Sequence, residues 1–514
     1  MKHKFDSTRL RQIIRGLLIG LAVGLVVSIF RLAIEYGLKM VIAIYQIMHQ
    51  TPWLLLPWTG LSIALALILG NMAQKNPAIQ GSGIPQIEGQ LAGSYEERWW
   101  PVLWRKFVGG ILSIGSGLFL GREGPSIQLG AAIGQGFAEF KHDSQINRRV
   151  SIASGAAAGL SAAFNAPIAS TLFILEEVYH NFSPLVWLSA LVSALTSNFV
   201  SLNFFGLTPV LHISYSQSLP LNQYGHLIIL GIILGLMGRL YQITLLKLPI
   251  WFGKLKSIQP AWYPVLPFTL VIVVGWFWPN TLGGGNGLII QMAQHNPSIL
   301  ILFGLLILRF VFSMISYGSM LPGGIFLPIL TIGAVIGGLY GQIMVSAGWL
   351  NATLVSNFII YAMAGYFAGI GKAPFTAILL ITEMVGSLGH LMPLAVVSIV
   401  AFTVVDLLSG APIYESLLNK LIKRTEITTN KEVSTLSTTI FMGSQLDGCQ
   451  IRDFEWPLGC LVSSIIRGEH RIVPHGDTVL QAGDTLIVSV DPDKQQAVFA
   501  HVVAAAQTQM DKLV

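Results

Sequence analysis

Long apolar segments alternate with short polar ones from the N-terminus to about residue 410. A basic arm over residues 1–16 precedes the apolar run LLIGLAVGLVVSIF. Such runs predict transmembrane helices, for which a full span needs about 20 residues. The first run continues too far for a cleaved signal peptide, so we expect a retained helix with a cytoplasmic N-terminus. Further apolar segments follow at 53–72, 101–120, 150–175, 184–203, 225–246, 264–278, 298–317, 325–346, 357–370, 374–386 and 390–408.

The composition agrees with a polytopic membrane protein. The 514 residues are 53% hydrophobic and 11% charged, whereas soluble domains carry about a quarter charged residues. A net charge of +6 without a long basic run gives no indication of nucleic-acid binding. The two cysteines, Cys449 and Cys460, are too few for a disulfide scaffold or a cysteine-based metal cluster. We therefore expect no metal and no cofactor.

Several apolar segments are short and are interrupted by glycine and proline. Examples are GSGIP, GREGP, FNAPIAS, LPGGIFLP and KAPFTA. Broken helices at membrane depth are tolerated only where they are buried or line a polar cavity. The pattern is therefore typical of a transport protein and not of a membrane anchor.

The chain also resembles itself at an offset of about 200 residues, which divides it into halves of about 15–205 and 220–423. Duplicated halves with interrupted helices are typical of secondary transporters, whose sites lie between the repeats. The repeat is inverted if each half has an odd number of spans. Three motifs recur in order: Gly81-Ser82-Gly83 as Gly283-Gly284-Gly285, Gly121-x-x-x-Pro125 as Gly324-x-x-x-Pro328, and NAPIASTLFILEEV from Asn165 as KAPFTAILLITEMV from Lys372.

GSGIP, GREGP and GGIFLP each place glycine directly before an apolar helical run. A helix N-terminus carries unpaired N–H groups and a partial positive charge, and glycine lets an anion approach the backbone. Three such ends around one cavity would hold an anion without a full positive charge. Alternatively, these glycines only allow close helix packing. Ser82 adds a hydroxyl donor, unless that hydroxyl bonds back to a helical carbonyl.

Glu123 lies in GREGP, within apolar sequence, where an ionisable residue indicates function. Its carboxylate would occupy the kind of site an anion prefers and would leave when protonated. The alternative is an ion pair with Arg122, although neighbours on a helix do not face each other.

Glu176 and Glu177 end the run STLFILEE, where both could simply be solvated at the membrane interface. In the repeat, Glu176 aligns with Glu383 and Glu177 aligns with Met384. We therefore expect a shared structural role for Glu176 and Glu383. Glu177 is the better candidate for proton transfer, which only one half would perform.

The character of the chain changes after residue 423. A polar segment at 424–434 predicts a linker, and a small cytoplasmic α/β domain is expected over 435–510. Its predicted strands are TTIFMG, GCLVSSIIRG, HRIVPHGD and DTLIVSVDPD, separated by turn residues.

Together, GSGIPQIEG, GREGPSIQLG, GAAAGLSAAFNAPIASTLFILEE and PGGIFLP resemble the CLC family of chloride channels and chloride/proton antiporters. The resemblance covers about residues 15–423 in the family's order and spacing. It implies an all-α polytopic membrane protein with a CLC-like fold. It also implies chloride ligands at Ser82, the amides of Ile325 and Phe326, and the hydroxyl of Tyr414 in SGAPIYESLL.

The same resemblance assigns the external gating glutamate to Glu123 and the internal proton-transfer glutamate to Glu177. Family members that only conduct commonly lack the internal glutamate, so both together favour an antiporter. Ser82 favours chloride, because nitrate-preferring relatives can carry proline there. One departure is Gln86, where the bacterial pattern has glutamate. The family further implies a homodimer with one pathway in each subunit.

A second resemblance covers the tail. The patterns G-x-x-I-x-D from Gly448, I-x-P-x-G-x-T-x-L from Ile472 and G-D-x-L from Gly483 are similar to the TrkA-C domain of potassium-conductance regulators. Such domains often dimerise and can bind small regulatory ligands. A purely structural dimerisation module is the alternative.

The sequence thus predicts exchange of chloride for protons across a prokaryotic inner membrane. A passive chloride channel of the same fold is the closest alternative. A potassium transport subunit would need a TVGYG-like filter, which the membrane part lacks. An intramembrane enzyme is disfavoured because HExxH and GxSxG are both missing there.

Overall fold

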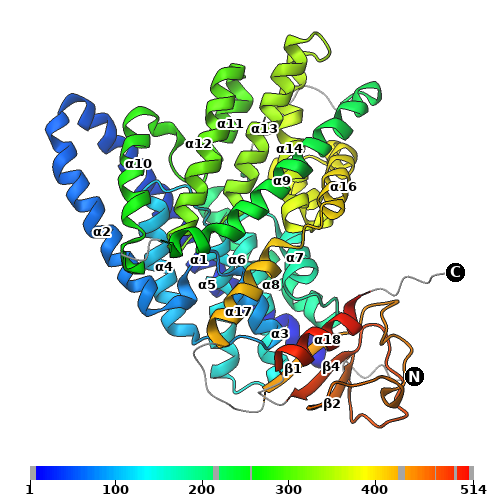
Figure 1. Cartoon of the computed structure of the whole chain (residues 1–514). Coiled ribbons are helices and arrows are strands. Elements are labelled where there is room, and N and C mark those ends of the chain that lie inside the picture. The colour runs from blue at the N-terminus through cyan, green and yellow to red at the C-terminus, as the bar shows by residue number, and fades with distance from the viewer. Residues whose placement is uncertain are drawn as a thin grey trace.

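The computed structural model describes residues 7–211, 213, 219–254, 258–426, 434–468, 470–490 and 495–508. A large helical domain is followed by a small domain of strands and one helix, which packs against one end of the helical domain (Figure 1). Among the described residues, nine helices are long and apolar enough to cross a membrane. The chain is therefore a multi-pass membrane protein.

The first half of the helical domain combines long helices with short ones. A π-helical turn, Ile174–Val178, continues α7. The helices are α1 (Ser7–Gln50), α2 (Leu55–Lys75), α3 (Ile84–Ala92), α4 (Trp99–Gly115), α5 (Glu123–Phe140), α6 (Gln145–Phe164), α7 (Pro167–Phe173) and α8 (Pro184–Phe205).

The second half follows a similar succession of long and short helices. It is succeeded by α17 (Ile413–Glu426), which leads toward the small domain. The helices are α9 (Tyr224–Gly253), α10 (Val265–Phe277), α11 (Asn286–His295), α12 (Ile299–Gly318), α13 (Phe326–Ser346), α14 (Val355–Gly371), α15 (Pro374–Val385) and α16 (Leu391–Leu407).

The apolar segment predicted at 150–175 is broken in the structure. Helix α6 ends at Phe164, its C-cap Asn165 has a positive φ of 54°, and α7 starts at Pro167. The second half repeats this break, because Lys372 has a φ of 60° and α15 starts at Pro374. Proline is favoured in the first turn of a helix and cannot continue the preceding one.

The helices around the centre pack with their backbones in close approach. A Cβ atom built on Gly130 of α5 would lie 2.0 Å from the carbonyl oxygen of Gly155 in α6. Small residues permit this kind of contact between membrane helices. The two helices therefore form a rigid pair, and α5 begins at the candidate glutamate Glu123.

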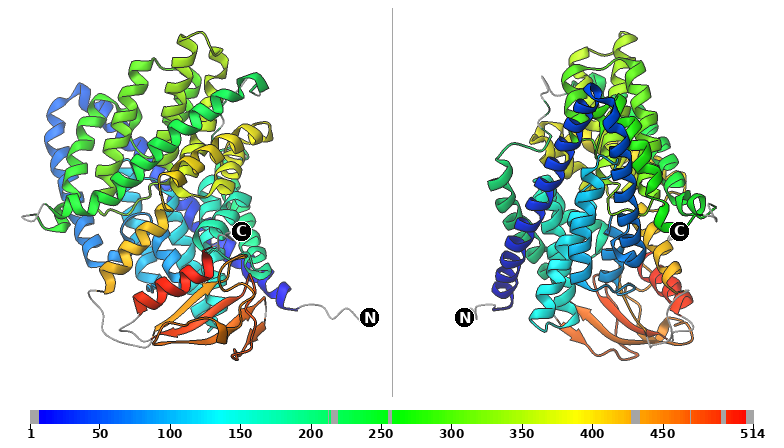
Figure 2. Two further views of the ribbon diagram at one scale, coloured as in Figure 1. Left: turned by 45° about the vertical axis from the view of Figure 1, so that its right-hand side comes forward. Right: turned by 90° about the vertical axis from the view of Figure 1, so that its left-hand side faces the viewer.

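The small domain is an antiparallel sheet with strand order β1-β4-β2-β3. The strands are β1 (Ser434–Thr439), β2 (Cys460–Arg467), β3 (His470–Ile472) and β4 (Thr485–Val490), and the helix is α18 (Gln495–Gln507). Leu436, Val488 and Val502 contribute to its core, which is separate from the cores of the helical domain. An α/β domain was expected here, and Figure 2 shows it below the helices.

The first strand lies earlier in the chain than predicted. The prediction was TTIFMG, residues 438–443, whereas β1 uses STLSTT. Leu436 and Thr438 alternate inward, and this edge strand needs only one apolar face. Of the predicted linker 424–434, residues 427–433 lie outside the described residues, 424–426 belong to α17 and 434 begins β1.

Candidate ion-transport site

Three glycine-containing loops meet at the centre of the helical domain. The N–H of Gly121 donates to the carbonyl of Gly324 at 2.7 Å, and the N–H of Gly324 donates back to Gly121 at 2.6 Å. Gly323 donates to the carbonyl of Gly81 at 3.0 Å. The loops before α3, α5 and α13 are thus bonded to one another. Gly121 and Gly324 pair in antiparallel orientation, as equivalent residues of two repeat halves do when a two-fold axis relates the halves.

The predicted anion ligands lie at the helix ends that follow these loops. Ser82 precedes α3, Ile325 is the N-cap of α13, and Phe326 is the first residue of α13. All three are almost completely buried. A Cβ atom on Gly124 would lie 2.8 Å from the carbonyl oxygen of Ser82, so α5 begins in contact with this loop.

Aromatic rings hold Phe326 and Tyr414 in place. The ring of Phe326 lies 4.4 Å from that of Phe367 and 5.7 Å from that of Phe173. The ring of Tyr414 packs edge-on against Phe173 at 6.1 Å. The Tyr414 hydroxyl is buried without a hydrogen-bond partner among the described residues. A buried hydroxyl usually has a partner, so this one is free to donate to a ligand.

Glu123 is the first residue of α5 and is completely buried. Neither carboxylate oxygen makes a hydrogen bond to a described group. The backbone N–H groups of Glu123 itself and of Leu327, in the first turn of α13, are within electrostatic reach of this carboxylate. Arg122 Nε lies 3.9 Å from this carboxylate, whereas Arg122 Nη1 pairs with Glu35 at 2.7 Å. The Glu123 side chain therefore occupies the space between two helix N-termini without a close ion pair.

Two buried cations hold the carbonyl groups of the loops. Lys106 Nζ donates to the carbonyls of Ile79 and Gly81 at 3.0 and 2.8 Å. In the second half, Arg309 Nη1 donates to the carbonyl of Gly283 at 2.8 Å. Both cations are fully buried, and they serve equivalent loops of the two repeats. Sequence reasoning missed both, although a charged residue inside an apolar segment was the available signal.

Glu176 and Glu177 lie on the π-helical turn and point to different surroundings. Glu177 is 4% exposed, so it is not simply solvated at the membrane interface. Glu88 of α3 and Glu415 of α17 are within electrostatic reach of Glu177. Glu177 and Glu123 are both within electrostatic reach of Tyr414. Single π turns are frequently found at functional sites.

A cavity of about 370 Å³ reaches Glu88 and Glu415 from the side of the small domain. His180 and Asn181 also line it, and the small domain closes it with residues that include Thr438 and Phe499. Titratable groups near Glu177 thus have an opening toward the domain interface. Glu415, which follows Tyr414 directly, could not be recognised from the sequence as part of this cavity.

Gln86, the departure from the family pattern, has a structural role. Its Nε2 donates to the carbonyl of Gln80 at 3.0 Å and to that of Ala78 at 3.4 Å. A glutamate could donate neither bond while ionised. The amide therefore supports the loop that leads to Ser82.

Broken helices around paired glycine loops, with buried carboxylates between them, define an ion transporter of the CLC type. The family model for voltage gated chloride channels matches residues 61–406, and the TrkA-C domain model matches residues 438–502. The chain belongs to the voltage gated chloride channel family, and its membrane domain is followed by a TrkA-C domain.

Named relatives and a solved structure agree with this assignment. The chain is 34% identical over 430 residues to the H(+)/Cl(-) exchange transporter ClcA of Vibrio campbellii, covering 80% of this chain and 89% of that protein. It is 31% identical to the ClcA of Salmonella arizonae, covering 82% and 90%. The solved structure of a slow cyanobacterial Cl⁻/H⁺ antiporter superimposes with a TM-score of 0.76 at 30% identity, covering 80% of this chain and 98% of that one.

Proposed function

We propose that this protein is a secondary active transporter that exchanges chloride for protons across the membrane. One observation carries the proposal: the buried Glu123 carboxylate lies where the loops before α3, α5 and α13 meet. An acid and an anion then compete for one place. The names of the relatives, which are exchange transporters, support the same function.

Chloride would bind to neutral donors. We assign the Ser82 hydroxyl, the amides of Ile325 and Phe326, and the Tyr414 hydroxyl as its ligands. The helix N-terminus of α13 supplies partial positive charge. Because none of these donors carries a full charge, they bind the ion weakly enough for it to leave again. Transport through a binding site requires both steps.

Protons would pass through Glu123 and Glu177. When Glu123 is ionised, it sits between the helix ends and excludes chloride. When it is protonated, it loses its attraction to these N-termini, swings toward the outer water and leaves its place to the anion. Glu177 would exchange protons with the cavity that reaches Glu88 and Glu415. The two fluxes are linked because the carboxylate and chloride cannot occupy the same place together.

The proposal extends to the enzymatic class, the location, the assembly and the domains of the protein. The protein acts as a transporter and not as an enzyme, and it lies in the inner membrane with both termini in the cytoplasm. Two copies form a homodimer, with one pathway in each subunit. The domains are 1–423 for transport and 435–510 for the TrkA-C module, and that module takes part in binding a small regulatory ligand.

The reversal potential separates an exchanger from a passive channel of the same fold. The purified protein is reconstituted in a planar bilayer at fixed chloride concentrations, and the pH of one side is changed. An exchanger shifts its reversal potential with the pH gradient. A reversal potential that follows chloride alone would identify a channel.

A further inference from the structure

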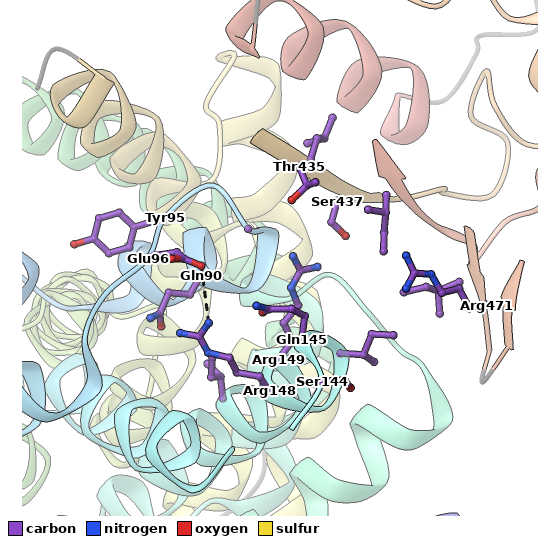
Figure 3. A pocket seen from close by; sticks show the side chains of 16 residues that line it. Gln90, Tyr95, Glu96, Ser144, Gln145, Arg148, Arg149, Thr435, Ser437 and Arg471 are labelled. Carbon is purple, nitrogen blue, oxygen red and sulfur yellow. Dashed lines mark ion pairs between the residues drawn. The ribbon is translucent and has the colours of Figure 1, made fainter. Parts of the chain in front are cut away.

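A second cavity, of about 390 Å³, lies between the membrane domain and the TrkA-C domain. Figure 3 shows side chains from both domains pointing into it. One wall comes from the end of α3, the segment after it and the first turns of α6, and includes Gln90, Tyr95 and Gln145. The opposite wall comes from the sheet and includes Thr435 and Ser437. Ligand sites of small molecules commonly have about 300–1,000 Å³, so this cavity has a suitable size.

The walls carry three arginines against one glutamate. Arg148 and Arg149 come from α6, Arg471 comes from β3, and the acidic residue is Glu96 (Figure 3). Arg148 is partly neutralised, since it lies 3.9 Å from Glu96 and 3.4 Å from Glu139. Within the part of the chain that the structure describes, no acidic group pairs with Arg149 or Arg471. Two guanidinium groups from different domains thus line one cavity, and neither forms an ion pair with a described residue.

The position of Arg149 depends on a glycine. Gly93, directly after α3, has a φ of 83°. A Cβ atom there would lie 2.7 Å from Arg149 Nη2, so the missing side chain makes room for the guanidinium. The first turn of α6, which begins after the N-cap Ser144, also lines the cavity and adds partial positive charge.

We propose that this cavity binds a small phosphate-bearing molecule that bridges the two domains. Arginine is the preferred partner of phosphate, because its planar group donates two parallel hydrogen bonds. Apolar side chains complete the lining, so the ligand also carries an organic part, as a nucleotide does. They are Ile146, Ile152, Leu436, Ile466 and Ile487.

Arg149 connects this site with the proposed proton route. Its side chain lines both this cavity and the cavity that reaches Glu88 and Glu415. A phosphate that binds Arg149 draws the guanidinium toward the ligand and changes the electrostatic field in the cavity of the two glutamates. The ligand would therefore alter the rate of exchange. This regulatory consequence rests on the proposed function, whereas the binding site does not.

Isothermal titration calorimetry tests binding without any transport. The full-length protein in a neutral detergent is titrated with ATP and with inorganic pyrophosphate. We expect saturable binding that weakens about tenfold in Arg149→Gln and in Arg471→Gln, because each loses a charge-assisted hydrogen bond. Lys141→Gln and Arg452→Gln remove cations of the same two domains outside the cavity. Binding to these two controls should stay within about twofold of the wild type.

A lipid headgroup is the other source of phosphate, and vesicles distinguish it. Exchange is measured in vesicles of phosphatidylcholine alone and of phosphatidylcholine with phosphatidylglycerol. If the headgroup is the ligand, neither soluble phosphate binds, exchange depends on phosphatidylglycerol, and Arg471→Gln removes that dependence. The proposal is overturned if soluble phosphates do not bind and the lipid dependence is missing or unchanged in Arg471→Gln. It is equally overturned if binding to both arginine variants equals that of the controls.

Discussion

Glu176 and Glu383, which the internal repeat relates, cap each other's helices. Oε2 of Glu176 accepts hydrogen bonds from the N–H and the hydroxyl of Thr376 in α15, at 2.9 and 2.7 Å. Glu383 accepts from the N–H groups of Ile168 and Ala169 in α7, at 3.2 and 2.8 Å. Each half of the protein thus supplies the carboxylate that satisfies a broken helix of the other half.

This reciprocity leads to a stability prediction. Glu176→Ala and Glu383→Ala each leave N–H groups at a helix start without a partner, so each should destabilise the protein by about 1–2 kcal/mol. The measurement is thermal unfolding of the purified protein in detergent. Glu455→Ala, an exposed carboxylate of the small domain, is the control and should leave the transition unchanged. Unfolding temperatures equal to the control for both variants would contradict the capping role.

Glu177 should differ from its neighbour in function. Glu177→Gln removes the ionisable group, so proton transport should be lost while chloride flux continues. Glu176→Gln retains an oxygen that accepts from Thr376, and it should keep proton coupling. Chloride efflux and proton uptake are recorded together from vesicles. Proton uptake against a chloride gradient in Glu177→Gln would exclude the role assigned to Glu177.

Lys106 should be required for an ordered anion site. Lys106→Met leaves the buried carbonyl of Ile79 without its donor, at a cost of about 1–3 kcal/mol, and leaves the carbonyl of Gly81 with the N–H of Gly323 as its remaining donor. The loop that carries Ser82 then shifts, and chloride should bind more weakly in calorimetric titrations. Lys75→Met removes an exposed lysine and serves as the control. Wild-type chloride affinity and stability in Lys106→Met would refute this role.

The sequence could predict the repeat and the meeting of the three loops, because glycine and proline mark the broken helices directly. The sequence also predicted different roles for Glu176 and Glu177, because only Glu176 aligns with a glutamate, Glu383, in the second half. The reciprocal helix caps of Glu176 and Glu383 explain why this pair is repeated. The boundary of β1 was wrong because serine and threonine resemble a linker until Leu436 and Thr438 are seen to face a core. Lys106 and Arg309 were missed because their partners are backbone carbonyls, which leave no mark in a sequence.

The small domain allows a prediction about pH. Arg467 Nη2 lies 2.7 Å from Asp484 Oδ2, and its Nε donates to Oδ1 at 2.8 Å. The hydrogen bond with Asp484 raises the pKa of Arg467. A raised pKa of a basic group means that its stabilisation is fully present below the ordinary arginine pKa and is lost only at higher pH. The contribution of Arg467 should therefore stay constant from neutral to moderately alkaline pH.

Arg467→Ala leaves the buried Asp484 without its partner and should destabilise the domain by about 3–5 kcal/mol, a value discounted toward its lower end because Arg467 is partly exposed. Limited proteolysis of the full-length protein at several pH values measures the effect. The exposed Arg452 provides the control variant Arg452→Ala. Equal cleavage rates for both variants would show that the pair does not stabilise the domain.

Proton uptake driven by a chloride gradient, in vesicles that contain either the wild type or Glu123→Gln, shows whether one carboxylate and chloride compete for the place between the helix ends. The wild type should take up protons against their gradient as chloride leaves. Glu123→Gln should move chloride without any proton uptake. Chloride-driven proton uptake that persists in Glu123→Gln would contradict the account.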